Sequence, residues 1–153
     1  KGVSLMPCNL YGPNDNFHPD NGHVIPALMT KFNNATEDTV TCWGDGTPTR
    51  EFMYVDDLAD ACLFAVEHYS NGELINVGSG QDVSIFHLAH KVAALTGYQG
   101  KIEWDTNRPN GTPKRPLDYS KITEKGWSPK YDLDAGLEKT YLWFQQATNL
   151  QTR

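Results

Sequence analysis

Long apolar runs, paired cysteines and an excess of positive charge are all missing from this sequence of 153 residues. No apolar stretch approaches the ~18 residues that a membrane-spanning helix needs, so we expect no membrane partner. The net charge is −6, which argues against a nucleic-acid partner because such proteins display a basic patch. Three scattered cysteines without a CxxC pair predict neither a disulfide scaffold nor a zinc site. These absences indicate a cytoplasmic location and no metal centre.

Segments typical of strands and helices alternate along the chain, which predicts an α/β fold with parallel strand pairing. A stretch rich in Pro, Gly, Asn and Asp over residues 7–22 predicts a loop. The chain opens inside an expected buried strand, which suggests a piece of a longer protein. The expected strands cover residues 3–6, 39–43, 50–55, 74–77 and 101–104, and the expected helices cover residues 24–34, 57–71, 84–96 and a last segment from 132.

Three local patterns have a structural and a chemical interpretation. Asp56 and Asp57 could form an acid/base pair, but capping of the following helix is the simpler explanation. The Gly-x-Gly segments at 44–46 and 78–80 predict tight turns, since neither continues to the third glycine of a dinucleotide fingerprint. His87 and His90 have helical spacing for a metal, but no third ligand is near in sequence.

The polar loop before residue 24 and a set of cations are the stronger functional candidates. Long polar loops are often functional, and His23 ends this one with a side chain that titrates near neutral pH. Cations that converge on one pocket would suit a phosphorylated ligand, although scattered surface charge is the alternative. Trp43 could stack on a base or a sugar, or belong to the core. The cations beside loops or strand ends are Lys31, Arg50, Arg108, Lys114 and Arg115.

Several segments together resemble the C-terminal half of extended short-chain dehydrogenases that act on nucleotide sugars. The broad signals are residues 9–13 (NLYGP), 43–57 (WGxGxxxRxFxYVDD) and 76–80 (NVGxG). Two narrower signals, residues 15–28 (DNFHP leading to HVIPAL) and 105–118 (DTxxPxGTP leading to LD), resemble the GDP-L-fucose synthase family. The resemblance covers essentially the entire chain.

This resemblance implies the last strands of a Rossmann-type parallel sheet, at residues 3–6 and 74–77, followed by a small α/β substrate-binding domain. Residues 1–153 would then be a C-terminal fragment, mostly substrate-binding domain, that lacks the N-terminal dinucleotide-binding half. The sequence has no GxxGxxG fingerprint, no YxxxK pair and no matching catalytic serine. We therefore expect the fragment to be inactive alone.

The family converts GDP-4-keto-6-deoxy-D-mannose to GDP-L-fucose by epimerising C3 and C5 and reducing the C4 ketone with NADPH. The resemblance implies that His23 is an acid/base residue working with a cysteine upstream of this chain, so Cys8 is not that cysteine. It also implies a homodimer of the full-length enzyme. The implied NADP(H)-binding residues are Pro7, Cys8, Asn9, Leu10 and His23, and the implied residues for the GDP-sugar are Lys31, Trp43, Arg50 and Asn110.

Three implied site residues depart from the family pattern. Cys8 stands where threonine is common, Lys31 where arginine is common, and Asn110 where aspartate is common. The lysine replaces a bidentate phosphate contact by a point charge. Two alternatives stay open: a nucleotide-sugar binding module without catalysis, and another nucleotide-sugar epimerase or dehydratase.

Overall fold

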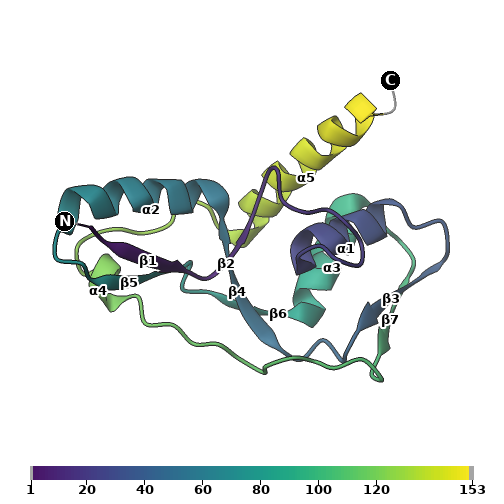
Figure 1. Ribbon diagram of the computed structural model, residues 1–153. Coiled ribbons are helices and arrows are strands. Elements are labelled where there is room, and N and C mark those ends of the chain that lie inside the picture. Colours follow the sequence, from purple (N-terminus) through teal and green to yellow (C-terminus); the bar gives the residue numbers. More distant parts are fainter. Residues whose placement is uncertain (1, 152–153) are drawn as a thin grey trace.

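The backbone is organised around three small sheets in a computed structural model that describes residues 2–151 (Figure 1). The strands are β1 (Ser4–Pro7), β2 (Asn9–Tyr11), β3 (Thr39–Trp43), β4 (Thr49–Tyr54), β5 (Leu74–Val77), β6 (Asp82–Ser84) and β7 (Lys101–Asp105). The helices are α1 (Val24–Asn33), α2 (Val55–His68), α3 (Ile85–Thr96), α4 (Ser120–Thr123) and α5 (Leu133–Gln151).

Strand pairing is mostly parallel, as the alternation of elements predicts. β1 pairs with β5, β2 with β4, and β3 with β7, all in parallel register. β6 adds to β4 in the antiparallel sense. The mixed α/β class with parallel strands is therefore confirmed.

Two hydrophobic clusters hold these elements together, and both follow the apolar periodicity of the helices. In the larger cluster, α1, α3 and α5 pack beside β2 and β4. In the smaller cluster, the buried face of α2 meets β5 and α4. Figure 1 shows α2 lying along the β1/β5 pair, with α1 and α3 side by side beyond β4. Side chains with almost no exposure are Ile25, Met29, Leu88 and Val92 in the larger cluster, and Ala61, Ile75, Val77 and Ile122 in the smaller one.

Local capping signals predict α3 correctly. The Ser84 side chain accepts a hydrogen bond from the N–H of His87 at 3.2 Å, which satisfies a donor of the first turn. Gly97 ends the helix in the left-handed conformation, with φ 77°. The Gly-x-Gly segments are turns as expected, with positive φ at Gly44, Gly46 and Gly80.

The expected cap of α2 is wrong. This helix begins at Val55, with Tyr54 at the N-cap, and Asp57 is turned inward at 1% exposure. Its carboxylate accepts the N–H groups of Lys130 (2.8 Å) and Tyr131 (3.2 Å). Asp57 is therefore a buried acceptor for a distant segment and does not cap its own helix. In α4 the N-cap is Tyr119, and Ser120 is the first residue of the helix.

Two short strands were not expected from the sequence. β2 lies within the segment predicted as loop, and β6 is a three-residue strand with no fully buried side chain. Both are too short for an alternating pattern to stand out. Among the described residues, no helix combines the length and apolar character needed to cross a bilayer.

Candidate functional site

Two adjoining pockets lie where α1, β4 and the start of α3 meet. The first has a volume of about 450 Å³ and is called the His23 pocket here. The second has a volume of about 240 Å³ and is called the Trp43 pocket. Val24 and Ile85 line both, so the two pockets lie next to each other, and the volume of the larger one is in the range of small-molecule sites.

The His23 pocket gathers six of the residues that the sequence singled out. Parallel pairing places Asn9 opposite Phe52, which brings the start of β2 against β4. The loop that ends at His23 then closes one side, and the loop after β7 closes another. The six residues are Cys8, Asn9, Leu10, His23, Arg50 and Asn110.

Arg50 is held by its own strand while it faces this pocket. It is partly buried, and its Nη1 donates to the carbonyl of Thr49 at 2.7 Å. A guanidinium has five N–H donors, so this contact leaves donors for an anionic ligand. The arginine is thus an oriented cation in the wall of the His23 pocket.

Asn110 fastens the loop of residues 106–119 over the same pocket. Its Oδ1 accepts the N–H of Asp45 at 2.7 Å. A Cβ on Gly44 would lie 2.3 Å from that oxygen, so this close approach requires glycine. Figure 1 shows the loop running from β7 back to α4 along one side of the molecule.

Trp43 lies in the second pocket with a cation on each of two neighbouring segments. Its side chain is 53% exposed, which rules out a core role. Lys31 Nζ lies 5.4 Å and Arg108 Cζ lies 5.0 Å from the ring centroid. Both distances are within cation–π range. The tryptophan and two cations together form a surface suited to an aromatic, negatively charged ligand.

The remaining predicted residues lie elsewhere. Pro7 ends β1 and lines neither pocket. Lys114 is paired with Asp82 at 2.5 Å, and Arg115 is exposed in the same loop. Of the five singled-out cations, Arg50 and Lys31 therefore line these pockets, and Arg108 lies against Trp43.

His23 pairs with a residue that the sequence did not single out as functional. Its Nδ1 lies 2.8 Å from Asp15 Oδ1. The His23 side chain is 76% exposed, whereas that of Asp15 is only 12% exposed. The signal in the sequence was present, since Asp15 opens the narrower motif, but eight residues separate the two side chains.

Cys8 is poorly suited to acid/base chemistry. Burial, followed by the nearby charge of Glu51, raises the pKa of its thiol to about 12. The thiol therefore keeps its proton at neutral pH.

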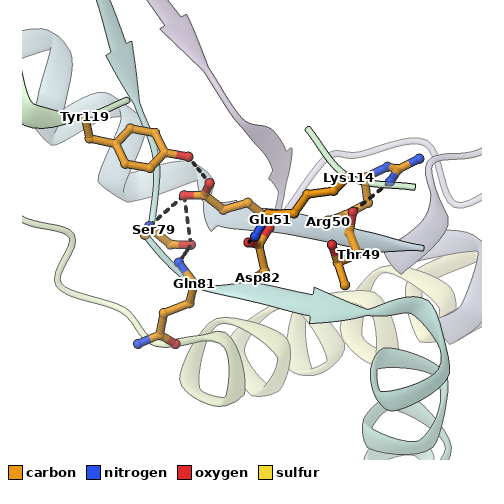
Figure 2. Close-up of polar contacts among 9 residues, drawn as sticks. Thr49, Arg50, Glu51, Ser79, Gln81, Asp82, Lys114 and Tyr119 are labelled. Atoms are coloured by element: carbon orange, nitrogen blue, oxygen red, sulfur yellow. Dashed lines mark hydrogen bonds and ion pairs between the residues drawn. The ribbon is translucent and has the colours of Figure 1, made fainter. Parts of the chain in front are cut away.

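Glu51 forms a second polar centre that the sequence analysis missed. It is only 7% exposed, and its carboxylate accepts hydrogen bonds from the N–H of Gly80 (2.6 Å) and the hydroxyl of Tyr119. Figure 2 shows Tyr119 and Ser79 pointing at this carboxylate from two separate segments. Burial raises the pKa of Glu51. The available sign was a glutamate inside a strand, directly before the apolar residues Phe52 and Met53.

This centre also explains the second Gly-x-Gly turn. A Cβ on Gly78 would lie 2.3 Å from Glu51 Oε1, so glycine is needed for close approach. The N–H of Gly80 already has a carboxylate partner. The turn at residues 78–80 therefore packs against Glu51 of β4 and against Tyr119, which precedes α4. The N–H of Gly80 is used by Glu51 and is not free to bind a phosphate.

The two histidines of α3 use one ring nitrogen each within their own segment. His87 Nδ1 lies 2.7 Å from Ser84 Oγ, and His90 Nδ1 lies 2.8 Å from the carbonyl of Phe86. Across the part of the chain that the structure describes, His, Cys, Asp and Glu side chains form no group of three or more that could hold a metal ion.

Comparisons with known proteins agree with the family resemblance of the sequence motifs. Residues 1–78 match the model of the NAD dependent epimerase/dehydratase family. The chain is 52% identical over 145 residues to GDP-L-fucose synthase 1 of Arabidopsis thaliana, covering 93% of this chain and 45% of that protein. It is 45% identical over 153 residues to GDP-L-fucose synthase of Escherichia coli (strain K12), covering 92% and 48%.

A solved structure agrees with these relatives. A GDP-L-fucose synthetase from Naegleria fowleri bound to NADP superimposes with a TM-score of 0.89 at 28% identity, covering 96% of this chain and 47% of that one. The resemblance seen in the motifs is thus confirmed. The chain spans about half the length of the curated relatives it matches.

Proposed function

Because this chain belongs to the NAD-dependent epimerase/dehydratase family, we propose that it supplies the sugar-nucleotide site and one acid/base residue of a GDP-L-fucose synthase. The complete enzyme would join residues 1–153 to a dinucleotide-binding half. It would epimerise C3 and C5 of GDP-4-keto-6-deoxy-D-mannose and reduce the C4 ketone.

The observation that carries this proposal is the convergence of predicted residues in two adjoining pockets. His23, Arg50 and Asn110 come from three separate segments, and all of them line the His23 pocket. Lys31 and Trp43 line the pocket that adjoins it. A scattered surface charge would not produce this arrangement, so the grouping favours a phosphorylated ligand.

His23 would move protons at the sugar ring. A C4 ketone acidifies the hydrogens on C3 and C5, so a positioned base can remove one of them. His23 suits that task because an imidazole can both take and return a proton near neutral pH. The partner on the opposite face would be a cysteine of the other half, since the raised pKa of Cys8 makes its thiol a poor acid or base.

The cations and Trp43 would hold the nucleotide. Arg50 and Lys31 would contact the diphosphate, with Arg50 offering a planar fork and Lys31 a point charge. Trp43 would offer an aromatic face to the base or the sugar. Asn110 would bind substrate from the loop that it fastens to Asp45.

NADPH would supply the hydride for the ketone when it is bound. Cys8, Asn9 and Leu10 line the His23 pocket, and they fit the uncharged nicotinamide end of such a cofactor because none of their side chains is charged at neutral pH. Pro7 lies outside both pockets, and its contact with the cofactor stays a prediction. The homodimer likewise stays a prediction from the resemblance, and the cytoplasmic location stays a prediction from the sequence composition.

The proposal is tested by His23→Gln in the complete enzyme. Solvent deuterium exchange at C3 and C5, followed by NMR, should fall by ~10²-fold or more, the usual scale for losing a positioned proton carrier. NADPH binding should survive. His68→Gln is the matched control, because His68 lies on α2 and its Nδ1 is bonded to the carbonyl of Phe64. Normal exchange in the His23 variant would reject the proposed role.

A further inference from the structure

The carboxylate of Asp15 is in hydrogen-bonding contact with the ring of His23. Oδ1 lies 2.8 Å from His23 Nδ1. A carboxylate oxygen accepts hydrogen bonds, so Nδ1 carries the proton in this pair. In the neutral ring, Nε2 is then the nitrogen with a free lone pair. This is the nitrogen that an acid/base role at the sugar would need.

Asp15 itself is held by a tight turn. Its N–H donates to the carbonyl of Gly12 at 3.4 Å, and Asn14 has the left-handed φ of 65°. Asp15 Oδ1 also accepts the N–H of Asn16 at 2.7 Å. The carboxylate therefore has a defined direction before it meets His23.

The second oxygen of Asp15 increases the importance of this contact. Oδ2 is buried and has no hydrogen-bond partner within the described residues. A buried carboxylate with an unsatisfied oxygen gains strongly from a nearby positive charge. Asp15 should therefore stabilise the charged ring that forms when Nε2 takes a proton.

The chain between the two residues is also tied in place. His18 Nδ1 accepts the N–H groups of Asp20 and Asn21, both at 3.2 Å, and the N–H of Gly22 donates to the carbonyl of His18 at 2.8 Å. The backbone of His23 is thereby positioned at the start of α1. Its ring is largely exposed, so the backbone alone does not set the direction of the ring.

We propose that Asp15 is a positioning residue for His23: it holds the ring in the Nδ1–H form, directs Nε2 into the His23 pocket and stabilises the charged ring. The proposal rests on the proposed function of His23. An exposed ion pair contributes little to stability. This pair differs because Asp15 is mostly buried and one of its oxygens lacks a donor.

The test combines a spectroscopic measurement with solvent exchange in the complete enzyme. Nitrogen NMR of histidine-labelled protein reports which ring nitrogen carries the proton, and His23→Gln assigns the signal. We expect Nδ1–H in the neutral ring of the unmodified enzyme. In Asp15→Asn the ring should lose that preference, because the amide can also donate.

Solvent exchange at C3 and C5 should fall in Asp15→Asn by roughly 10- to 100-fold, the range for partners that orient a metal-bound histidine. Asp15→Glu should restore part of the exchange because it keeps the charge. Asp38→Asn makes the same chemical change at an exposed aspartate outside both pockets and should alter neither measurement.

The outcomes separate the two proposals. An Nε2–H ring in the unmodified enzyme would overturn the positioning role without any variant, so a misfolded variant does not block the test. An unchanged ring form or unchanged exchange in a folded Asp15→Asn enzyme would also overturn it. If exchange is normal in His23→Gln while the ring form still depends on Asp15, the proposed function fails and the contact itself stands.

Discussion

Replacing Arg50 by alanine should weaken binding of GDP and of the GDP-sugar. The guanidinium lies in the His23 pocket, and one of its five N–H donors is used on the carbonyl of Thr49. The other donors remain for an anionic ligand. The loop runs beside this guanidinium, since a Cβ built on Gly111 would lie 3.5 Å from Nη2, at ordinary contact distance.

The size of the effect follows from the hydrogen bonds that the substitution removes. A hydrogen bond to a charged group contributes ~1.5–3 kcal/mol. Removing one such bond to the diphosphate corresponds to a rise in Kd of roughly 10- to 150-fold. Arg50→Lys keeps the charge but loses the fork and the bond to Thr49, so its Kd should lie between those of the alanine variant and the unmodified enzyme.

Isothermal titration of the complete enzyme with GDP measures this change directly. Lys139→Ala is the control, since it removes an exposed cation on α5 that lines neither pocket. A Kd for Arg50→Ala equal to that of the unmodified enzyme would remove Arg50 from the site. Equal weakening by both variants would mean that only the overall charge matters.

Four further predictions concern stability, thiol reactivity and the isolated chain. Burial raises the pKa of Glu51 above its ordinary value of 4.5, so the folded state keeps this proton to higher pH than the unfolded state. The free energy of unfolding should therefore fall as the pH rises through that window, and urea titrations of Glu51→Gln should no longer show this fall. Tyr119→Phe removes the hydroxyl donated to the same carboxylate and should cost ~1.5–3 kcal/mol at neutral pH in the same titrations. Iodoacetamide at mildly alkaline pH should modify the exposed Cys62 well before Cys8, whose pKa burial raises to about 12; equal peptide labelling by mass spectrometry would contradict this. Residues 1–153 alone should not oxidise NADPH with the keto-sugar nucleotide, because the sequence has neither a GxxGxxG fingerprint nor a YxxxK pair; substrate-dependent loss of NADPH absorbance would refute that expectation.

Much of the fold could be predicted because local chemistry specifies it. Ser84 and Gly97 delimit α3 through contacts within a few residues of the chain. The apolar spacing of α1 and α5 predicts their buried faces in the same way. β2 and β6 could not be predicted, since strands of three residues depend on a partner strand rather than on their own pattern.

For the candidate site, too, the sequence predicted some features and the structure was needed for others. Its residue types were evident from the motifs, and six of the predicted residues meet in one pocket. Trp43 could have been core or surface, and its 53% exposure excludes the core. Arg108 and Lys114 were equivalent as loop cations, yet one lies beside Trp43 and the other pairs with Asp82.

By itself, the sequence determined the order and approximate bounds of most helices and strands, the family and the chemical types of the site residues, because these depend on short-range spacing and on motifs. Only the tertiary structure decided the partners of the buried carboxylates. Asp57 accepts hydrogen bonds from backbone N–H groups 73 and 74 residues away in the sequence. Glu51 accepts one from the hydroxyl of Tyr119, 68 residues away. The Asp15–His23 contact spans eight residues across a folded loop. Such pairings arise when burial leaves a charged oxygen in need of a donor, and which donor is near depends on how distant segments pack.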